Sequence, residues 1–131
     1  MALQKNDIVD IARAIRDRAH APYSKFKVGA ALVSSSGKIY EGCNVENISF
    51  GLTMCAERVA VGAAVAGGTR DFRLLAIVAD SKDPIVPCGA CRQVLAEFNP
   101  SLRIISSTLG GQTAEFRLDE LLPKPTQGIL Q

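Results

Sequence analysis

Four cysteines, Cys43, Cys55, Cys88 and Cys91, are the side chains of this sequence best suited to chemistry. Cys88 and Cys91 form a Cys-x-x-Cys pair. In a protein of the reducing cytosol, this spacing indicates metal binding or redox work more than a structural disulfide. The sequence holds a single histidine, His20. A metal site built from these side chains would therefore be rich in thiolates, and thiolate ligands favour zinc.

Two predicted helices, residues 55–66 and 88–98, place three of the cysteines in their first turns. The N-terminus of a helix exposes unpaired N–H groups and the positive end of the helix dipole, and both favour a thiolate. If the two helix starts meet, Cys55, Cys88 and Cys91 reach one zinc ion. Three protein ligands leave the fourth tetrahedral position for water, which is typical of a catalytic zinc.

Glu57 and Arg58 follow Cys55 directly and complete the predicted site. A carboxylate beside an activated water can take its proton and pass it to a leaving group. Residues i and i+2 do not face each other in a regular helix, so this pair works only in an irregularly capped first turn. Three thiolates around Zn²⁺ leave a net negative formal charge. A guanidinium at Arg58 could donate to the sulfur atoms and offset that charge.

The cysteines alone leave two other interpretations open. In the first, Cys43 is a fourth ligand and closes a structural zinc site. In the second, Cys88 and Cys91 form a thioredoxin-like redox pair, which leaves Cys55 and Glu57 without a role. If the zinc is catalytic, Cys43 becomes the buried thiol of a strand.

The elements that must position these residues follow from hydrophobic periodicity and turn residues. Apolar residues from Ile8 to Ala19 recur at helical spacing, with Asn6 as the expected N-cap and His20 at the helix end. Helices interleaved with strands predict one sheet between helix layers. Strands are expected over 28–33, 38–40, 74–79, 103–107 and 113–116, helices over 8–19, 55–66 and 88–98, and a helical turn over 118–122.

Length and composition restrict the classes of protein. The 131 residues, 47% of them hydrophobic and 21% charged, predict one domain over 1–131 with its own core and a loose tail over 124–131. The net charge is +2 and the basic residues are spread along the chain, so we expect no nucleic-acid partner. No apolar run approaches the roughly 20 residues that a bilayer requires, and no secretory signal is evident, so we expect a cytoplasmic protein.

Two motifs of the sequence are Cys55-Ala56-Glu57 and Pro87-Cys88-Gly89-Ala90-Cys91. Zinc-dependent nucleobase deaminases carry a His- or Cys-x-Glu motif followed by Pro-Cys-x-x-Cys, and both motifs match. With several further segments, the sequence resembles the small, homotetrameric, all-cysteine cytidine deaminases over about residues 8 to 123. The further segments are Pro22-Tyr23-Ser24, Phe26-Lys27-Val28-Gly29-Ala30-Ala31, Gly42-Cys43-Asn44-Val45-Glu46-Asn47, Cys91-Arg92-Gln93 and Glu120-Leu121-Leu122-Pro123.

The resemblance implies an α/β fold, a three-layer α/β/α sandwich with a mixed five-stranded sheet. It also implies the Zn²⁺-dependent hydrolytic deamination of free cytidine and deoxycytidine, a reaction of pyrimidine salvage. Homotetramers with shared active sites are expected. In the implied site, Cys55, Cys88 and Cys91 hold zinc, Glu57 moves the proton, Phe26 packs on the base, the N–H of Ala56 meets the base carbonyl, Asn44 and Glu46 bind the ribose, and Arg58 supports the thiolates.

Two departures from the family pattern leave the substrate open. Phe50 stands where the family often has tyrosine. The family usually carries a phenylalanine three residues after Pro123, where this chain has Thr126, and no aromatic residue follows Phe116. A deaminase of a modified cytosine nucleoside such as blasticidin S is therefore the nearest alternative. A non-catalytic binding module stabilised by structural zinc is the alternative from another class.

Overall fold

The computed structural model describes residues 4–125, so Thr126 and most of the expected tail lie outside the described residues. None of the helices within this range is long and apolar enough to cross a membrane. The elements are α1 (Lys5–Arg16), β1 (Val28–Ser34), β2 (Ile39–Cys43), the 3₁₀ turn η1 (Phe50–Leu52), α2 (Ala56–Ala66), β3 (Phe72–Ala79), α3 (Gly89–Phe98), β4 (Arg103–Thr108), β5 (Thr113–Arg117) and α4 (Leu118–Leu121).

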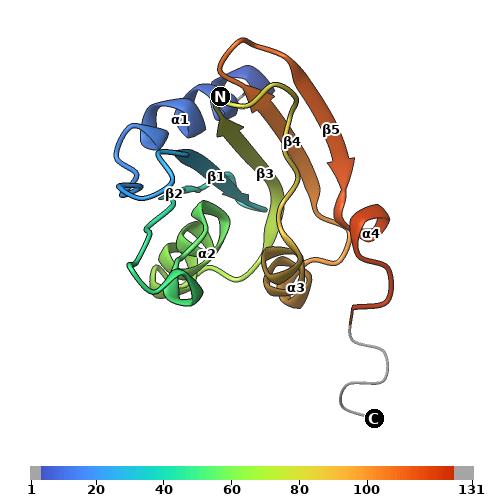
Figure 1. The fold of residues 1–131 in the computed structure, drawn as a ribbon. Helices are drawn as coiled ribbons and strands as arrows, with labels where there is room; N and C mark the ends of the chain where they lie inside the picture. The colour runs from blue at the N-terminus through green and yellow to red at the C-terminus, as the bar shows by residue number, and fades with distance from the viewer. Residues whose placement is uncertain (1–3, 126–131) are drawn as a thin grey trace.

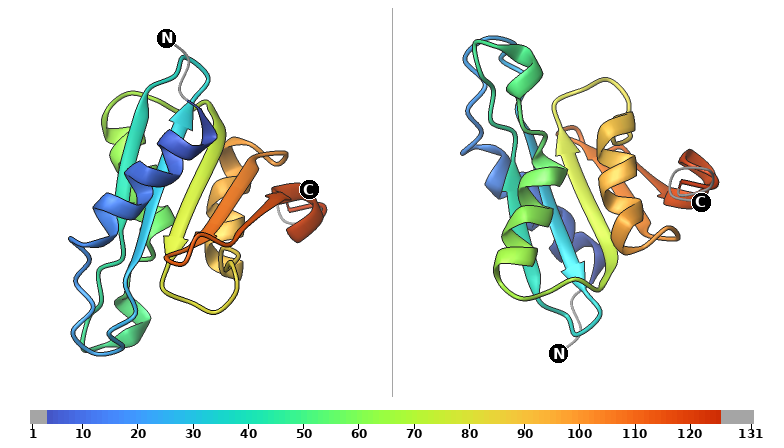
Figure 2. Two further views of the ribbon diagram at one scale, coloured as in Figure 1. Left: turned by 90° about the horizontal axis from the view of Figure 1, so that it is seen from above. Right: turned by 90° about the horizontal axis from the view of Figure 1, so that it is seen from below.

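One five-stranded sheet, in the order β2-β1-β3-β4-β5, separates the helices into two layers. Strands β3 and β4 are parallel, and the other neighbouring pairs are antiparallel, so the sheet is mixed as predicted. Helix α1 lies across one face, and α2 and α3 lie side by side on the other (Figures 1 and 2). The predicted three-layer α/β/α sandwich is confirmed.

Each face of the sheet has its own apolar layer, because the side chains of a buried strand alternate between the two faces. The continuous apolar run of β3 supplies both layers, as expected for an inner strand. On the α1 side the layer contains Ile8, Val9, Ala12, Ala31, Val33, Leu74, Ala76, Val78 and Ile105. On the α2 and α3 side it includes Leu32, Ala60, Ala64, Leu75, Ile77, Leu95 and Ile104.

Two glycines allow helices to approach the sheet closely. A Cβ atom at Gly29 would stand 1.9 Å from the carbonyl oxygen of Ala12 in α1. A Cβ atom at Gly42 would stand 2.3 Å from the carbonyl oxygen of Ala56 in α2. Real side chains never approach so closely, so these glycines set the depth at which α1 and α2 rest on strands β1 and β2.

Both ends of the first helix differ from prediction. The N-cap is Gln4 and not Asn6, and the Asp7 carboxylate accepts a hydrogen bond from the Gln4 N–H at 3.0 Å. The helix stops at Arg16, three residues before the expected end, and tighter turn bonds follow it. His20 is therefore not a helix-end residue: its N–H donates to the carbonyl of Asn44 at 3.0 Å, in a bridge to the segment after β2.

Candidate active site

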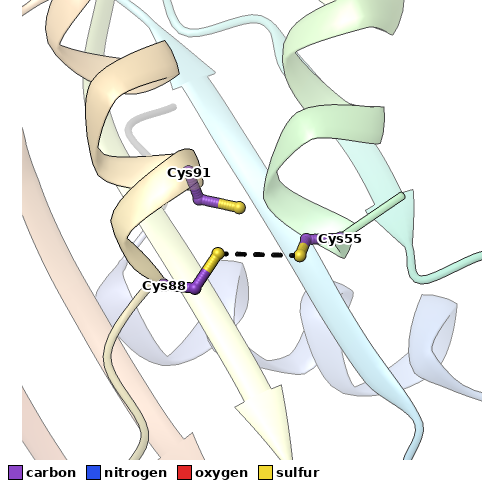
Figure 3. A group of neighbouring side chains, drawn as sticks. All are labelled: Cys55, Cys88 and Cys91. Carbon is purple, nitrogen blue, oxygen red and sulfur yellow. Dashed lines mark hydrogen bonds between the residues drawn. The ribbon is translucent and has the colours of Figure 1, made fainter. Parts of the chain in front are cut away.

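Helices α2 and α3 begin next to each other, and their first turns bring three thiols together (Figure 3). Cys55 is the N-cap of α2, Cys88 is the N-cap of α3, and Cys91 lies in the first turn of α3. All three sulfur atoms lie within 4.8 Å of one another. Cysteine occupies a position where serine or threonine usually caps the helix, and neither N-cap side chain bonds to the helix backbone. The sulfur atoms thus stay available as ligands.

Cys43 stands apart from this group. It is the last residue of β2 and is half-buried, and not fully buried as predicted. Among residues 4–125, the three thiols of Cys55, Cys88 and Cys91 are the one group of histidine, cysteine or carboxylate side chains close enough to hold a metal ion. The closed four-cysteine site considered from the sequence therefore does not form.

A cavity of about 220 Å³ opens beside the thiols. Its lining contains several of the residues predicted for the site, namely Phe26, Asn44, Cys55, Ala56, Glu57 and Cys88. Four further lining residues, Val28, Thr53, Ile85 and Val86, were not predicted. Ile85 and Val86 directly precede Pro87 and Cys88 in an otherwise polar loop. Two apolar residues beside a predicted metal ligand were the one sequence feature that could have indicated that they line the site.

Glu57 is a buried carboxyl group in the first turn of α2, with 5% of its surface exposed. Its pKa is raised to about 7, mainly by burial and also by the nearby charge of Cys55. The predicted irregular first turn is present: Cys55 has extended backbone angles, φ −71° and ψ 153°, whereas Glu57 is helical. Cys55 and Glu57 can therefore line one cavity although they are only two residues apart. A carboxyl group that titrates near neutral pH can both accept and return a proton.

Arg58 contacts the thiols directly. Its guanidinium donates to the carbonyl of Thr53 at 3.1 Å and to Sγ of Cys55 at 3.6 Å. The pKa of Cys55 is lowered to about 5, first by a hydrogen bond from Cys91 and also by Arg58. The Nε atom of Arg58 is buried without a partner of its own. The guanidinium is thus held against the sulfur atoms, where its charge favours thiolate.

Asn44 joins the cavity to the segment that carries Phe26. Its Oδ1 accepts from the N–H of Val28 at 2.8 Å, and its Nδ2 donates to the carbonyl of Phe26 at 2.8 Å. The amide therefore fixes one wall of the cavity. Phe26 is 39% exposed and is not part of the apolar core.

Glu46 lies two residues further on but does not line the cavity. Its carboxylate accepts hydrogen bonds from the N–H of Tyr23 at 3.0 Å, the N–H of Ser24 at 3.2 Å and the Ser24 hydroxyl. These bonds lower the pKa of Glu46, and the Ser24 hydroxyl contributes most. Glu46 and Asn44 thus anchor the same segment from two points.

Residues 3–107 match the family model of the cytidine and deoxycytidylate deaminase zinc-binding region. The chain belongs to this deaminase family. A cytidine deaminase of Sporosarcina psychrophila is 50% identical over 113 residues, which are 86% of this chain and 83% of the relative. A second, of Halalkalibacterium halodurans, is 44% identical over 92% of both chains. The crystal structure of cytidine deaminase from Burkholderia pseudomallei superposes with a TM-score of 0.90 at 45% identity, and covers 93% of this chain and 98% of that chain.

Zinc is the metal that this deaminase family implies, and the three thiols fit it. Thiolates are preferred zinc ligands, and the distances between the sulfur atoms allow all three to bind one ion. Two of the thiols, Cys55 and Cys88, also line the cavity, so the group is open on the side where a substrate would enter. The three thiols of the deaminase thus form an open metal site with three protein ligands.

Proposed function

We propose that this deaminase converts cytidine and deoxycytidine to uridine and deoxyuridine with release of ammonia, using zinc. The observation that carries the proposal is the placement of a buried carboxyl group, Glu57, in one cavity with the thiols of Cys55 and Cys88. The relatives reported above are cytidine deaminases, which does not favour a blasticidin S deaminase or a binding module.

The chemistry divides between the metal and Glu57. In the proposal, Cys55, Cys88 and Cys91 hold zinc, which when bound makes water a stronger nucleophile at neutral pH. Glu57 accepts the proton that the water loses and delivers it to the amino group on C4 of the base. A C–O bond forms at C4, the C–N bond breaks, and ammonia leaves. The raised pKa of Glu57 suits both halves of this transfer.

Substrate contacts follow from the cavity lining. We propose that Phe26 packs on the base and that the N–H of Ala56, at the start of α2, meets the base carbonyl. From the family resemblance we assign Asn44 and Glu46 to the ribose, although of the two only Asn44 lines the cavity. Asn44 already bonds to the backbone of Val28 and Phe26, so a ribose would share an amide that is held in place.

A homotetramer with shared active sites is the assembly we propose. Its support is a set of exposed apolar side chains on the segments 23–26 and 45–54, which also carry the cavity-lining residues Phe26 and Thr53. Ile48 is 83% exposed, Leu52 is 67% exposed and Phe50 is 63% exposed, and the Phe50 ring packs edge-on against Tyr23 with centroids 5.9 Å apart. Exposed apolar patches of this kind mark interaction sites. Sedimentation equilibrium measures the number of subunits.

We further propose that residues 1–131 act as one domain in the cytoplasm, within pyrimidine salvage. The three thiols need a reducing compartment to remain available to zinc. One continuous five-stranded sheet, with an apolar layer on each face, supports a single folding unit over the described residues.

The decisive experiment is a substrate panel on the zinc-loaded protein. Loss of cytidine absorbance is followed beside deoxycytidine, deoxycytidine monophosphate and blasticidin S, and zinc per chain is measured on the same sample. We expect turnover of both nucleosides. Absence of turnover on cytidine by protein that carries zinc would overturn the proposal, and faster turnover of blasticidin S would reassign the substrate.

A further inference from the structure

Arg92 holds two separate segments of main chain with one side chain. Its Nε donates to the carbonyl of Pro87 at 2.7 Å, and its Nη1 donates to the carbonyl of Leu121 at 3.2 Å. The first bond reaches the residue directly before Cys88. The second reaches the end of α4, which is far along the chain.

The backbone of Arg92 makes a third contact at the same place. Its N–H donates to the carbonyl of Cys88 at 2.9 Å, which is the first hydrogen bond of α3. The carbonyl of Pro87 lies one residue ahead of that bond and has no acceptor role in the helix pattern. The peptide groups on both sides of the Cys88 Cα atom are therefore held by Arg92. Together they fix the direction in which the Cys88 side chain leaves the backbone.

Cys88 is the thiol that most needs this support. Cys91 is buried inside α3, and Cys55 is contacted by Arg58, whereas Cys88 is exposed. Packing therefore restrains the Cys88 sulfur less than it restrains the Cys91 sulfur. Pro87, by contrast, is fully buried, so the bond from Arg92 reaches a part of the chain that is itself held in place.

The same bond affects one wall of the cavity. Ile85 and Val86 line the cavity and are followed at once by Pro87. A bond that fixes the Pro87 carbonyl thus limits the motion of this wall as well as of Cys88. The family resemblance included Arg92 in the segment Cys91-Arg92-Gln93 but assigned it no role, because that role depends on where its guanidinium reaches in three dimensions.

We propose that Arg92 is a positioning residue, which orients the Cys88 thiolate toward zinc and holds the end of the loop that lines the cavity. The proposal rests on the function proposed above. Hydrogen-bond partners that orient metal ligands are worth about 10- to 100-fold in metal affinity or activity when they are lost. Arg92 acts here through the main chain on either side of the ligand.

The test compares Arg92→Ala and Arg92→Lys with Gln93→Ala. Gln93 is the neighbour in α3 and donates to the carbonyl of Pro125 at 3.2 Å, so this control removes a tie to the C-terminal segment and leaves the Pro87 bond intact. Zinc release to a coloured chelator is timed at a temperature well below unfolding. The Co²⁺-substituted proteins are compared by their thiolate-to-metal absorption bands, and kcat and KM are measured for cytidine.

We expect Arg92→Ala to release zinc about 10- to 100-fold faster than the parent protein, to shift the cobalt bands and to lose kcat. Arg92→Lys keeps the charge and one donor group but not the forked geometry, so its rate of zinc release should lie between those of the parent protein and Arg92→Ala. Gln93→Ala should match the parent. A parent-like release rate and cobalt spectrum in Arg92→Ala would overturn the proposal, and equal acceleration in Gln93→Ala would overturn it too, since that would be a general loosening of α3.

If Arg92→Ala does not fold, Arg92→Lys decides, because a parent-like release rate in that variant would show that the forked contact is not needed. If the parent protein binds zinc but does not deaminate cytidine, the proposed function fails while the release rates still test Arg92.

Discussion

The Sγ atoms of Cys55 and Cys88 lie 3.9 Å apart, although 33 residues separate them in the chain. Each is the N-cap of its own helix, so the contact joins the starts of α2 and α3. Strand β3 lies between the two helices in sequence, and α2 and α3 lie side by side on one face of the sheet (Figure 2). The thiol group therefore forms only where the starts of α2 and α3 meet.

Substitution of single cysteines should distinguish zinc ligands from cysteines that do not bind the metal. Cys88→Ala and Cys91→Ala each take one donor from a group of three, so we expect zinc per chain to fall sharply after dialysis and activity to be lost. Cys43→Ala is the matched control, since Cys43 lies outside that group, and it should keep its zinc. Zinc is measured by atomic absorption. Loss of zinc in Cys43→Ala would revive a closed structural site.

Glu57→Gln should abolish turnover and leave the fold intact. The amide has the same shape as the buried carboxyl group but cannot accept and return a proton, so kcat should fall by about 10²- to 10⁴-fold. Zinc content and thermal unfolding should match the parent. Glu97→Gln alters an exposed glutamate of α3 and should keep full activity. An active Glu57→Gln protein would show that another group moves the proton.

Arg58→Gln tests whether charge near the sulfur atoms matters. The guanidinium donates to Cys55 at 3.6 Å, so its loss should raise the pKa of that thiol and weaken zinc binding or activity by about 10- to 100-fold. Chelator competition and steady-state kinetics measure the two effects. Arg70→Gln removes the charge of an exposed arginine and serves as the control. Equal zinc affinity and activity in both variants would remove Arg58 from the site.

Gly29→Ala should destabilise the fold strongly. The new methyl group would stand 1.9 Å from the Ala12 carbonyl oxygen, so α1 must move away from the sheet, at a cost of about 3 kcal/mol or more in the free energy of unfolding. Gly62→Ala is the matched control, because Gly62 lies on the exposed side of α2 with nothing within 4 Å. That change should stabilise the helix by about 0.5–1 kcal/mol. Urea unfolding measures both, and a neutral Gly29→Ala would contradict the close approach of α1.

The hydrogen bond from Ser24 to Glu46 should make stability depend on pH. The pKa of Glu46 is lower in the folded chain than its ordinary value of 4.5, so the bond stabilises the fold above that value and the effect is lost as the pH falls through the lower, folded value. Ser24→Ala should therefore destabilise the protein at pH 7, with a difference that shrinks on acidification. Ser81→Ala is the control. It removes a hydroxyl that donates to a main-chain carbonyl and not to a carboxylate, so its effect on stability should show no such pH dependence. Urea unfolding at several pH values provides the comparison.

Local signals predicted the helices of the site with few errors. The predicted helix over 55–66 appears as an N-cap at Cys55 followed by Ala56–Ala66, and the predicted start at Cys88 is the N-cap of α3. The prediction failed at α1, where an interaction between Gln4 and Asp7 starts the helix two residues earlier than Asn6 would. Helix ends are set by such local bonds, and several residues of one segment can compete to form them.

The residue types and their spacing determined what chemistry this chain can do: three thiols and a carboxylate at helix starts, and a family motif that contains them. Only the tertiary structure decided which of them meet. It excluded Cys43 from the thiol group, buried Glu57, placed Ile85 and Val86 on the cavity wall and turned the Arg92 side chain back to Pro87. Propensity and periodicity describe contacts within a segment. Contacts between segments depend on the order of the strands and the depth of helix packing, which no single stretch of sequence specifies.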